Sequence, residues 1–236
     1  MRAFVLAAGE GRRLLPLTTR LPKPMIAIGG RPILEYNVRM LVKYGITDIV
    51  INTHHLPQVV QNHFGDGAAF GARISYSQEP ALLGTAGALN AVRAAFDEPF
   101  LVMYGDNLTT CDLSRLWASR QPGDLGAMAL YSREDVSHSG VAVLDSADRI
   151  TEFVEKPTGA VASHWVNAGL IVFTPEIFRY IPAAGPSDFG RDVLPVSLAG
   201  GASLRGYRMS ERLWWIDSFE DYARTNHDPA LAELSA

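Results

Sequence analysis

The chain has 236 residues, of which 47% are hydrophobic and 19% charged, a balance that excludes a disordered chain. Its formal net charge of -4 excludes a globally basic nucleic-acid binder, and its single cysteine, Cys111, excludes a disulfide framework or a cysteine-cluster zinc site. The sequence contains no apolar run of 18 residues, and Glu10 closely follows the short apolar N-terminal run. We therefore expect a cytoplasmic protein with no membrane or nucleic-acid partner.

Strand-like and helix-like segments alternate along the first 120 residues. Apolar runs predict strands at Ala3–Ala8, Asp48–Thr53, Arg73–Ser77 and Phe100–Tyr104. Helical periodicity, with Asp112 as a cap for the last helix, predicts helices at Pro32–Tyr44, Leu56–Phe64, Thr85–Ala95 and Leu113–Arg120. The first, second and fourth strands are apolar throughout, which is typical of parallel strands covered on both faces.

From about residue 125 the spacing changes to strands and turns. Further strands are predicted at Gly126–Tyr131, Gly140–Leu144, Ile150–Glu155, Ala168–Phe173 and Leu204–Met209, before a helix at Phe219–Asn226 that Ser218 can cap. The pattern indicates an α/β fold with a mixed, mostly parallel sheet flanked by helices and a small β extension. We expect one domain over residues 1–236, with halves at 1–120 and 121–236.

A glycine-rich turn follows the first predicted strand directly, at Gly9–Leu14. Glycines in such a turn let backbone N–H groups approach an anion closely. A Walker A loop is absent, and a dinucleotide fingerprint would need a third glycine near position 14, where Leu14 stands. Five basic residues and no acidic one lie between Gly11 and Leu34, namely Arg12, Arg13, Arg20, Lys23 and Arg31. This pattern favours a triphosphate cradle, and a solvated basic loop is the alternative.

Six motifs, in order, resemble those of the sugar-1-phosphate nucleotidylyltransferases, also called NDP-sugar pyrophosphorylases. They are Gly9–Thr18 with Pro22-Lys23-Pro24, Gly84–Leu89, Gly105-Asp106-Asn107, Glu155-Lys156-Pro157, Asn167-Ala168-Gly169 and Trp215-Ile216-Asp217. The resemblance spans roughly residues 1–228. It implies a Rossmann-like, GT-A-like nucleotidyltransferase fold with a nucleotide-binding first half and a sugar-binding second half. The left-handed β-helix domain of longer relatives is not expected.

The resemblance also implies a reaction and a set of site residues. The family transfers a nucleotidyl group from a nucleoside triphosphate to a sugar 1-phosphate and expels pyrophosphate. Arg13, Lys23 and Asp106 would be catalytic, and Asp106 and Asp217 would hold Mg²⁺. The nucleotide would contact Leu6, Ala8, Gly9, Gly11, Arg13, Lys23, Gln78, Gly84 and Thr85. The sugar phosphate would contact Asn107, Gly140, Glu155, Lys156 and Asn167.

Several alternatives stay open at this point. Asp106 could instead cap a turn, and Asp217 could begin the last helix. The loop at Gly84–Leu89 favours GTP and a mannose-, heptose- or glucose-like sugar, with UTP or dTTP as alternatives. A catalytically silent subunit that binds nucleotide sugars is a second class of function. A homo-oligomer is compatible with the sequence, and the pair His54 and His55 shows no metal-ligand spacing.

Overall fold

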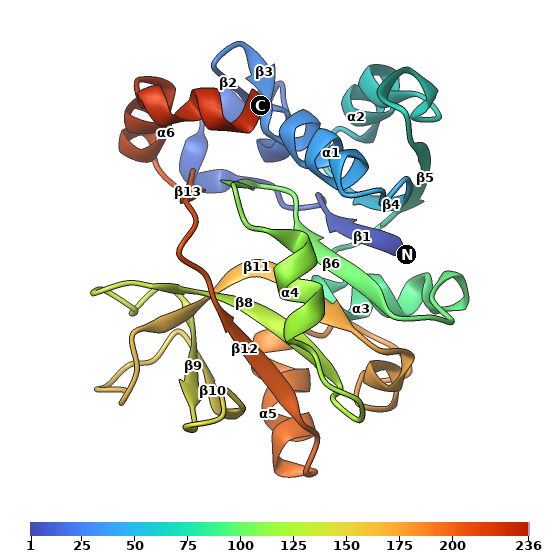
Figure 1. The fold of residues 1–236 in the computed structure, drawn as a ribbon. Helices are drawn as coiled ribbons and strands as arrows, with labels where there is room; N and C mark the ends of the chain where they lie inside the picture. The colour runs from blue at the N-terminus through green and yellow to red at the C-terminus, as the bar shows by residue number, and fades with distance from the viewer. Residues whose placement is uncertain (236) are drawn as a thin grey trace. The chain divides into compact units, whose positions relative to one another are not determined.

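The structure is a computed structural model that describes residues 1–235, and it divides into two compact units. Unit 1 comprises residues 1–82 and 103–110 together with the described residues from Glu211 onward. Unit 2 comprises residues 83–102 and 111–210. Both units therefore contain segments that are distant in the sequence, as the colours of Figure 1 show.

The sheet of unit 1 is built on parallel strands from the N-terminal apolar runs. β1 (Arg2–Leu6) pairs with β4 (Asp48–Thr53), which pairs in turn with β5 (Arg73–Gln78). The interior of β1 is fully buried, which explains why this run carries no alternating polar residues. β6 (Phe100–Tyr104) spans the boundary of the units, and the Gly105 N–H just beyond it donates to the Leu6 carbonyl at 2.8 Å.

Two helices follow from the periodicity of this first segment. α1 (Ile33–Lys43) buries Leu34, Val38 and Leu41, and Gly45 adopts a positive φ of 73° just after its end. α2 (Pro57–Phe64) begins with proline at a first-turn position, where the missing N–H costs no helical hydrogen bond. Both helices belong to unit 1 (Figure 1).

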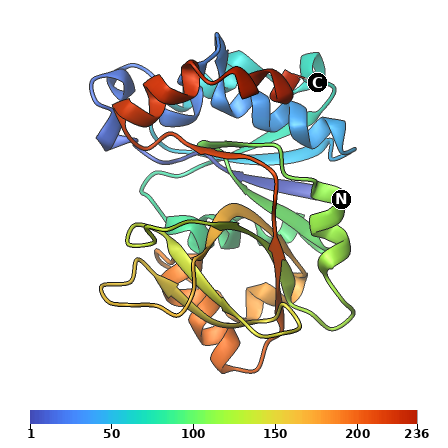
Figure 2. The same ribbon diagram turned by 60° about the vertical axis from the view of Figure 1, so that its left-hand side comes forward.

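A second core of unit 1 joins its three segments. It contains two short strand pairs, β2 (Ala27–Ile28) with β3 (Arg31–Pro32) and β7 (Asn107–Thr109) with β13 (Leu213–Trp215). Buried side chains of this cluster are Leu14, Ile26, Ile28, Ile33, Tyr36, Leu108, Trp214 and Ile216. α6 (Phe219–Asn226) and the 3-10 segment Pro229–Ser235 place further apolar side chains on the cluster. Figure 2 shows both segments in red beside the blue N-terminal segments of unit 1. Trp214 is thus a packing residue of this core.

The strands of unit 2 pair in both parallel and antiparallel directions. β11 (Trp165–Phe173) pairs antiparallel with β8 (Gly126–Ser132) and with β9 (Gly140–Leu144). β8 also pairs in parallel with β12 (Leu204–Arg208), and β9 pairs antiparallel with β10 (Ile150–Glu155). The helices of this unit are α3 (Gly84–Ala91), α4 (Leu113–Ser119) and α5 (Leu194–Ala199).

The expected fold class is confirmed, because the parallel strands β1–β4–β5 and the mixed strands β8–β12 are combined with flanking helices. The helix expected at Thr85–Ala95 is corrected: α3 starts at Gly84 and ends at Ala91, and a separate 3-10 turn covers Arg93–Ala95. Val92 separates the two because its φ of -116° is not helical. The short strands β2, β3, β7 and β13 and helix α5 were not predicted, since two- to six-residue elements carry little periodicity.

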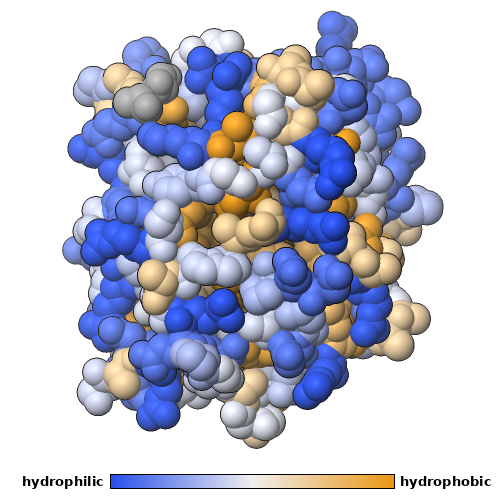
Figure 3. All heavy atoms as spheres, turned by 45° about the vertical axis from the view of Figure 1, so that its right-hand side comes forward, coloured by the Kyte–Doolittle hydropathy of each residue, from blue (hydrophilic) through white to orange (hydrophobic). Residues whose placement is uncertain are grey.

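Exposed large apolar side chains are few, and Val196, at 57% exposure, is the most exposed of them. Hydrophilic residues predominate on the face drawn in Figure 3. Among residues 1–235, no helix combines the length and apolar character needed to span a bilayer.

Candidate active site

The carboxyl end of β1 is held by a buried polar pair that the sequence analysis did not single out. The Ala7 N–H donates to Asn52 Oδ1 at 2.6 Å, and Asn52 Nδ2 donates to Glu79 Oε1 at 2.6 Å. Asn52 is 2% exposed and Glu79 is 4% exposed. The Ala7 N–H is thus bonded to a side chain and is not available to the strand ladder, which agrees with the end of β1 at Leu6 and not at Ala8. An amide within an otherwise apolar strand was the available signal.

The glycine turn after β1 wraps closely around Lys23. Gly11 has a φ of 63°, and a Cβ atom there would lie 2.8 Å from both Lys23 Cβ and Thr18 Cγ2. Thr18 Oγ1 donates to the Gly11 carbonyl at 3.0 Å, and Leu14 anchors the turn in the core at 1% exposure. Glycine at position 11 is therefore required for the loop to close over the lysine side chain.

Asp106 stands at the end of β6 because Gly105 permits a close approach of two chains. A Cβ atom at Gly105 would lie 2.9 Å from the Leu6 carbonyl oxygen. β7 begins directly after Asp106 and pairs antiparallel with β13, with Asn107 opposite Trp215. Asp217 follows two residues after Trp215, so this strand pair carries both aspartates to the same end.

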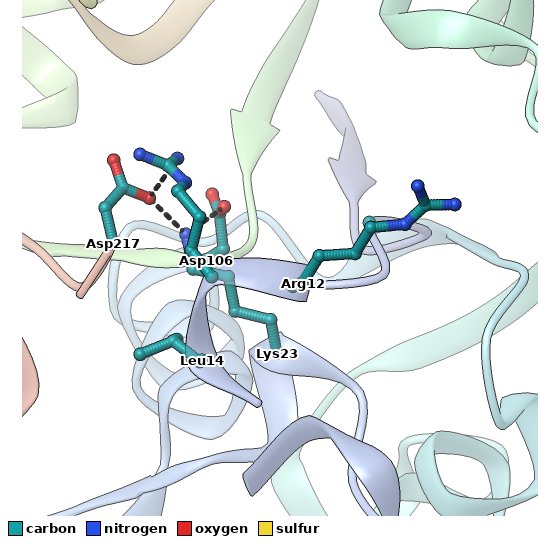
Figure 4. A pocket seen from close by; sticks show the side chains of 8 residues that line it. Arg12, Leu14, Lys23, Asp106 and Asp217 are labelled. Atoms are coloured by element: carbon teal, nitrogen blue, oxygen red, sulfur yellow. Dashed lines mark hydrogen bonds and ion pairs between the residues drawn. The ribbon is translucent and has the colours of Figure 1, made fainter. Parts of the chain in front are cut away.

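Lys23 lies between the two aspartates. Its Nζ donates to Asp106 Oδ2 and to Asp217 Oδ1, each at 2.7 Å (Figure 4). The Lys23 side chain is only 8% exposed. Arg13 Nη2 makes a further ion pair with Asp217 Oδ1 at 3.0 Å. One cation is thus shared by both carboxylates, and a second cation contacts one of them.

The pKa values of these groups follow from the same contacts. Burial alone would lower the pKa of Lys23, but the charges of Asp106 and Asp217 outweigh it and raise that pKa above 10.5. Burial would raise the pKa of Asp217, but Lys23 and Arg13 outweigh it and hold that pKa below 3.8. The lysine is therefore cationic and Asp217 anionic at neutral pH.

Arg12 behaves differently from Arg13. Its side chain is 81% exposed, pairs with Glu10 at 2.6 Å, and extends away from the two aspartates (Figure 4). An exposed pair between near neighbours contributes little to stability. The hypothesis that Arg13, and not Arg12, is the site arginine agrees with this placement.

The side chains surround a pocket of about 210 Å³ in unit 1. It is lined by Gly9, Gly11, Arg12, Arg13, Leu14, Lys23, Asp106 and Asp217. Six of these residues were predicted for the site from the motifs, and the structure brings them together. Cationic side chains beside exposed glycine backbone suit a polyanionic ligand such as a polyphosphate.

The two aspartates also fit a divalent cation. They are 34% and 35% exposed, and each already directs an oxygen at the Lys23 cation. Mg²⁺ takes oxygen ligands and is commonly held by one or two carboxylates while it keeps several waters. Groups of three or more His, Cys, Asp or Glu side chains suited to a metal do not occur within residues 1–235. The donor set therefore fits an ion that is completed by water and ligand oxygens.

The remaining residues predicted to contact the nucleotide do not line this pocket. Gln78 ends β5 in unit 1 and is exposed. Gly84 and Thr85 begin α3 in unit 2, where Thr85 N and Oγ1 both donate to Asp188 Oδ1, at 3.2 and 3.1 Å. Gly84 has a φ of 71° and packs against the Ser187 backbone.

Most of the residues predicted for the sugar phosphate lie in unit 2, while Asn107 lies in β7 of unit 1. Glu155 ends β10 directly opposite Gly140 of β9, and burial raises the pKa of the Glu155 carboxyl. Lys156 adopts a φ of 49°, a left-handed conformation that non-glycine residues rarely take and that is common at functional sites. Asn167 Oδ1 accepts from the Gly169 N–H at 2.9 Å where the β11 register shifts.

The neighbouring histidines are explained by backbone contacts. His54 Nδ1 lies 2.8 Å from the Glu79 carbonyl and His55 Nε2 lies 2.9 Å from the Thr18 carbonyl, so each ring nitrogen donates to a carbonyl oxygen. Both side chains thereby support the loop segments around the site.

Comparison with known proteins agrees with this geometry. A family model described as nucleotidyl transferase matches residues 2–228. The chain belongs to the nucleotidyl transferase family. The family resemblance inferred from the six sequence motifs is thereby confirmed.

Named relatives differ in their nucleotide. A UTP–glucose-1-phosphate uridylyltransferase of Synechocystis sp. is 34% identical over 92% of this chain and 60% of its own length. The uridylyltransferase AglF of Haloferax volcanii is 35% identical over 92% of this chain and 90% of its own. A mannose-1-phosphate guanylyltransferase of Mycobacterium tuberculosis is 32% identical over 96% of this chain and 64% of its own. This family member thus spans about three fifths of the length of several relatives.

Solved structures show the same fold. A Bacillus anthracis protein named as a glucose-1-phosphate thymidylyltransferase, solved with sucrose, superposes with a TM-score of 0.84 at 26% identity. The match covers 98% of this chain and 95% of that one. A UDP-glucose pyrophosphorylase solved with UDP-glucose also superposes with a TM-score of 0.84, at 22% identity, and this match shows the likeness of fold.

Proposed function

We propose that the chain transfers a nucleotidyl group from a nucleoside triphosphate to a sugar 1-phosphate and releases pyrophosphate. One observation carries the proposal: Lys23 is buried between Asp106 and Asp217, with Arg13 beside them, at the mouth of the glycine turn. Such a site provides positioned cations and a metal-binding carboxylate pair. Phosphoryl-group chemistry depends chiefly on these two features.

Six residues of the unit 1 pocket have a defined part in this proposal. The Arg13 side chain is 70% exposed, so it can turn from Asp217 toward a phosphate and bind it with two parallel hydrogen bonds. The Lys23 ammonium adds a permanent positive charge beside the phosphates, and Gly9 and Gly11 line the same pocket. Asp106 and Asp217 would hold Mg²⁺, which when bound neutralises phosphate oxygens and polarises the α-phosphate.

The sugar 1-phosphate is assigned to the second set of residues. Lys156 would contact its phosphate, and Glu155 would accept hydrogen bonds from its hydroxyl groups. Asn107, Gly140 and Asn167 are the further contacts proposed for this substrate. The carboxylate of Glu155 supports this assignment because it is half-buried and carries no hydrogen bond within the described chain.

For the base we propose GTP, because the loop at Gly84–Leu89 resembles that of the guanylyltransferases. The named relatives include uridylyl- and guanylyltransferases, so UTP is the competing base. Gln78, Gly84 and Thr85 are the proposed base-side contacts, together with Leu6 and Ala8. The test assays four nucleoside triphosphates in combination with mannose, heptose and glucose 1-phosphates. Pyrophosphate release then ranks the substrate pairs by turnover.

The decisive test replaces the carboxylates within that assay. Asp106→Asn and Asp217→Asn should each lower Mg²⁺-dependent turnover by about 10²-fold or more, because each removes an anionic ligand of a hard cation. Asp112→Asn, which alters the cap of α4 in unit 2, is the matched control and should retain turnover. Full pyrophosphate release in both site variants would contradict the metal assignment. No release by the unmodified protein with any pair would favour a silent nucleotide-sugar-binding subunit.

A further inference from the structure

The carboxylate of Glu155 stands in a recess formed by two glycines of unit 2. A Cβ atom at Gly190 would overlap Glu155 Oε2 and lie 3.0 Å from its Cδ. A Cβ atom at Gly140 would lie 2.7 Å from the same oxygen. Real Cβ atoms essentially never approach other atoms closer than 3.0 Å. Glu155 can therefore occupy this position only while both neighbours lack a side chain.

Within the described chain, this carboxylate has no hydrogen-bond or ion-pair partner. The charged groups that face it are Lys156, Arg191 and Asp188, and none of them contacts it directly. Polar groups away from bulk water are almost always hydrogen-bonded, and leaving one unpaired costs free energy. An unpaired carboxylate in a recess that two glycines keep open indicates that a ligand donor completes it.

The backbone at Gly190 is held firmly. It lies in the π-helical turn Phe189–Val193, and such turns are frequent at functional sites. Phe189 is fully buried, and its N–H donates to Thr85 Oγ1 at 2.8 Å. The Asp188 N–H donates to Asp192 Oδ2 at 2.7 Å. An added methyl group at position 190 would therefore displace the flexible end of Glu155, and the backbone would stay in place.

We propose that Gly190 is a specificity-determining position for the sugar, acting through the position of the Glu155 carboxylate. The proposal rests on the proposed function, since it assigns a hydroxyl of the sugar 1-phosphate as the missing donor. A site built to accept a substrate hydroxyl rejects the analogue that lacks it by a large factor. Gly190 is a positioning residue, because it acts only by leaving the space in which Glu155 stands.

The test compares Gly190→Ala with Gly159→Ala. Gly159 is exposed in the same unit, and a Cβ atom there would meet nothing within 4 Å, so it is a matched control. Each variant is assayed with the preferred sugar 1-phosphate, with its monodeoxy analogues and with varied nucleoside triphosphate. We expect Gly190→Ala to raise the KM for the sugar 1-phosphate about 10–100-fold and to lose discrimination against one deoxy analogue. The KM for the nucleotide should change less than twofold, and Gly159→Ala should match the unmodified protein.

A double mutant separates this mechanism from a general structural effect. Glu155→Gln alone should lose discrimination against the same deoxy analogue, and adding Gly190→Ala to it should cause little further loss, because both changes act on one contact. Glu155→Asp, which withdraws the carboxylate by one methylene, provides the same readout if Gly190→Ala does not fold. Unchanged sugar KM and discrimination in Gly190→Ala, or in Glu155→Asp in its place, would overturn the inference and leave the proposed function intact. Absence of turnover in the unmodified protein would overturn both.

Discussion

Replacing Lys23 with methionine removes one positive charge and keeps a side chain of similar length. The Lys23 ammonium makes two hydrogen bonds, to Asp106 and Asp217, that are both 2.7 Å long, and it has little access to water. The variant leaves two neighbouring carboxylates without their shared cation, although Arg13 still contacts Asp217. We expect a folded protein that is less stable in the absence of divalent cations.

The size of the loss follows from the contacts. A hydrogen bond to a charged group contributes about 1.5–3 kcal/mol. Both carboxylates are about one third exposed, so water replaces part of each bond, and the free energy spent on burying the ammonium is recovered. These effects leave a net loss of about 1–3 kcal/mol. For a chain of this size, that corresponds to a fall in Tm of roughly 2–10 °C.

The assay is thermal unfolding of Lys23→Met in EDTA and in millimolar MgCl₂. Magnesium should raise the Tm of the variant more than that of the unmodified protein, because the freed carboxylates no longer hold a competing cation. The difference in Tm in EDTA should persist across neutral pH and shrink as the pH falls below 3.8, through the lowered folded pKa of Asp217. Lys43→Met, at an exposed position near the end of α1, is the control. Equal stability in EDTA and an equal response to magnesium would refute the reasoning.

Two further predictions concern single side chains. Arg13→Ala should lower kcat by about 10²–10³-fold and leave the sugar KM nearly unchanged, because its guanidinium would contact the reacting phosphate. The exposed ion pair of Arg13 with Asp217 adds under about 1 kcal/mol of stability, so the variant should fold. Steady-state kinetics test this prediction, and an unchanged kcat with a raised sugar KM would argue against it. Glu155→Gln should raise the free energy of unfolding at pH 8 by roughly 0.5–1 kcal/mol, because burial raises the pKa of this carboxyl and its charge opposes folding. The same variant should lose discrimination against the deoxy analogue named above. That gain should fade as the pH falls toward 4.5, and a variant that is less stable at pH 8 would contradict the prediction.

Elements with a strong local signal were predictable. The apolar runs located β1, β4 and β6 to within two residues, because fully buried parallel strands need continuous apolar sequence. Asp112 and Ser218 cap helices as expected, since a cap depends on residues within one turn.

Features that depend on distant chain segments were not predictable. β7 and β13 are three residues each, and their pairing joins positions about a hundred residues apart. The motif resemblance named Asp106 and Asp217, but their shared bond to Lys23 follows from that pairing. The overlap of Gly190 with Glu155 is likewise a contact in space, and neither residue carries a local sequence signal for it.

The three-segment construction of unit 1 has a consequence for the order in which the protein is made. Lys23 and its two aspartate partners are separated by 83 and 194 positions in the chain. A chain growing on the ribosome exposes the cationic turn first, but it cannot supply the second carboxylate until a further 194 positions have been added after Lys23. Contacts of such high sequence separation form late and slowly, because a long loop must close first. A prematurely terminated chain would therefore carry the phosphate-binding turn without the pair of aspartates, so nascent and truncated chains would have no complete site.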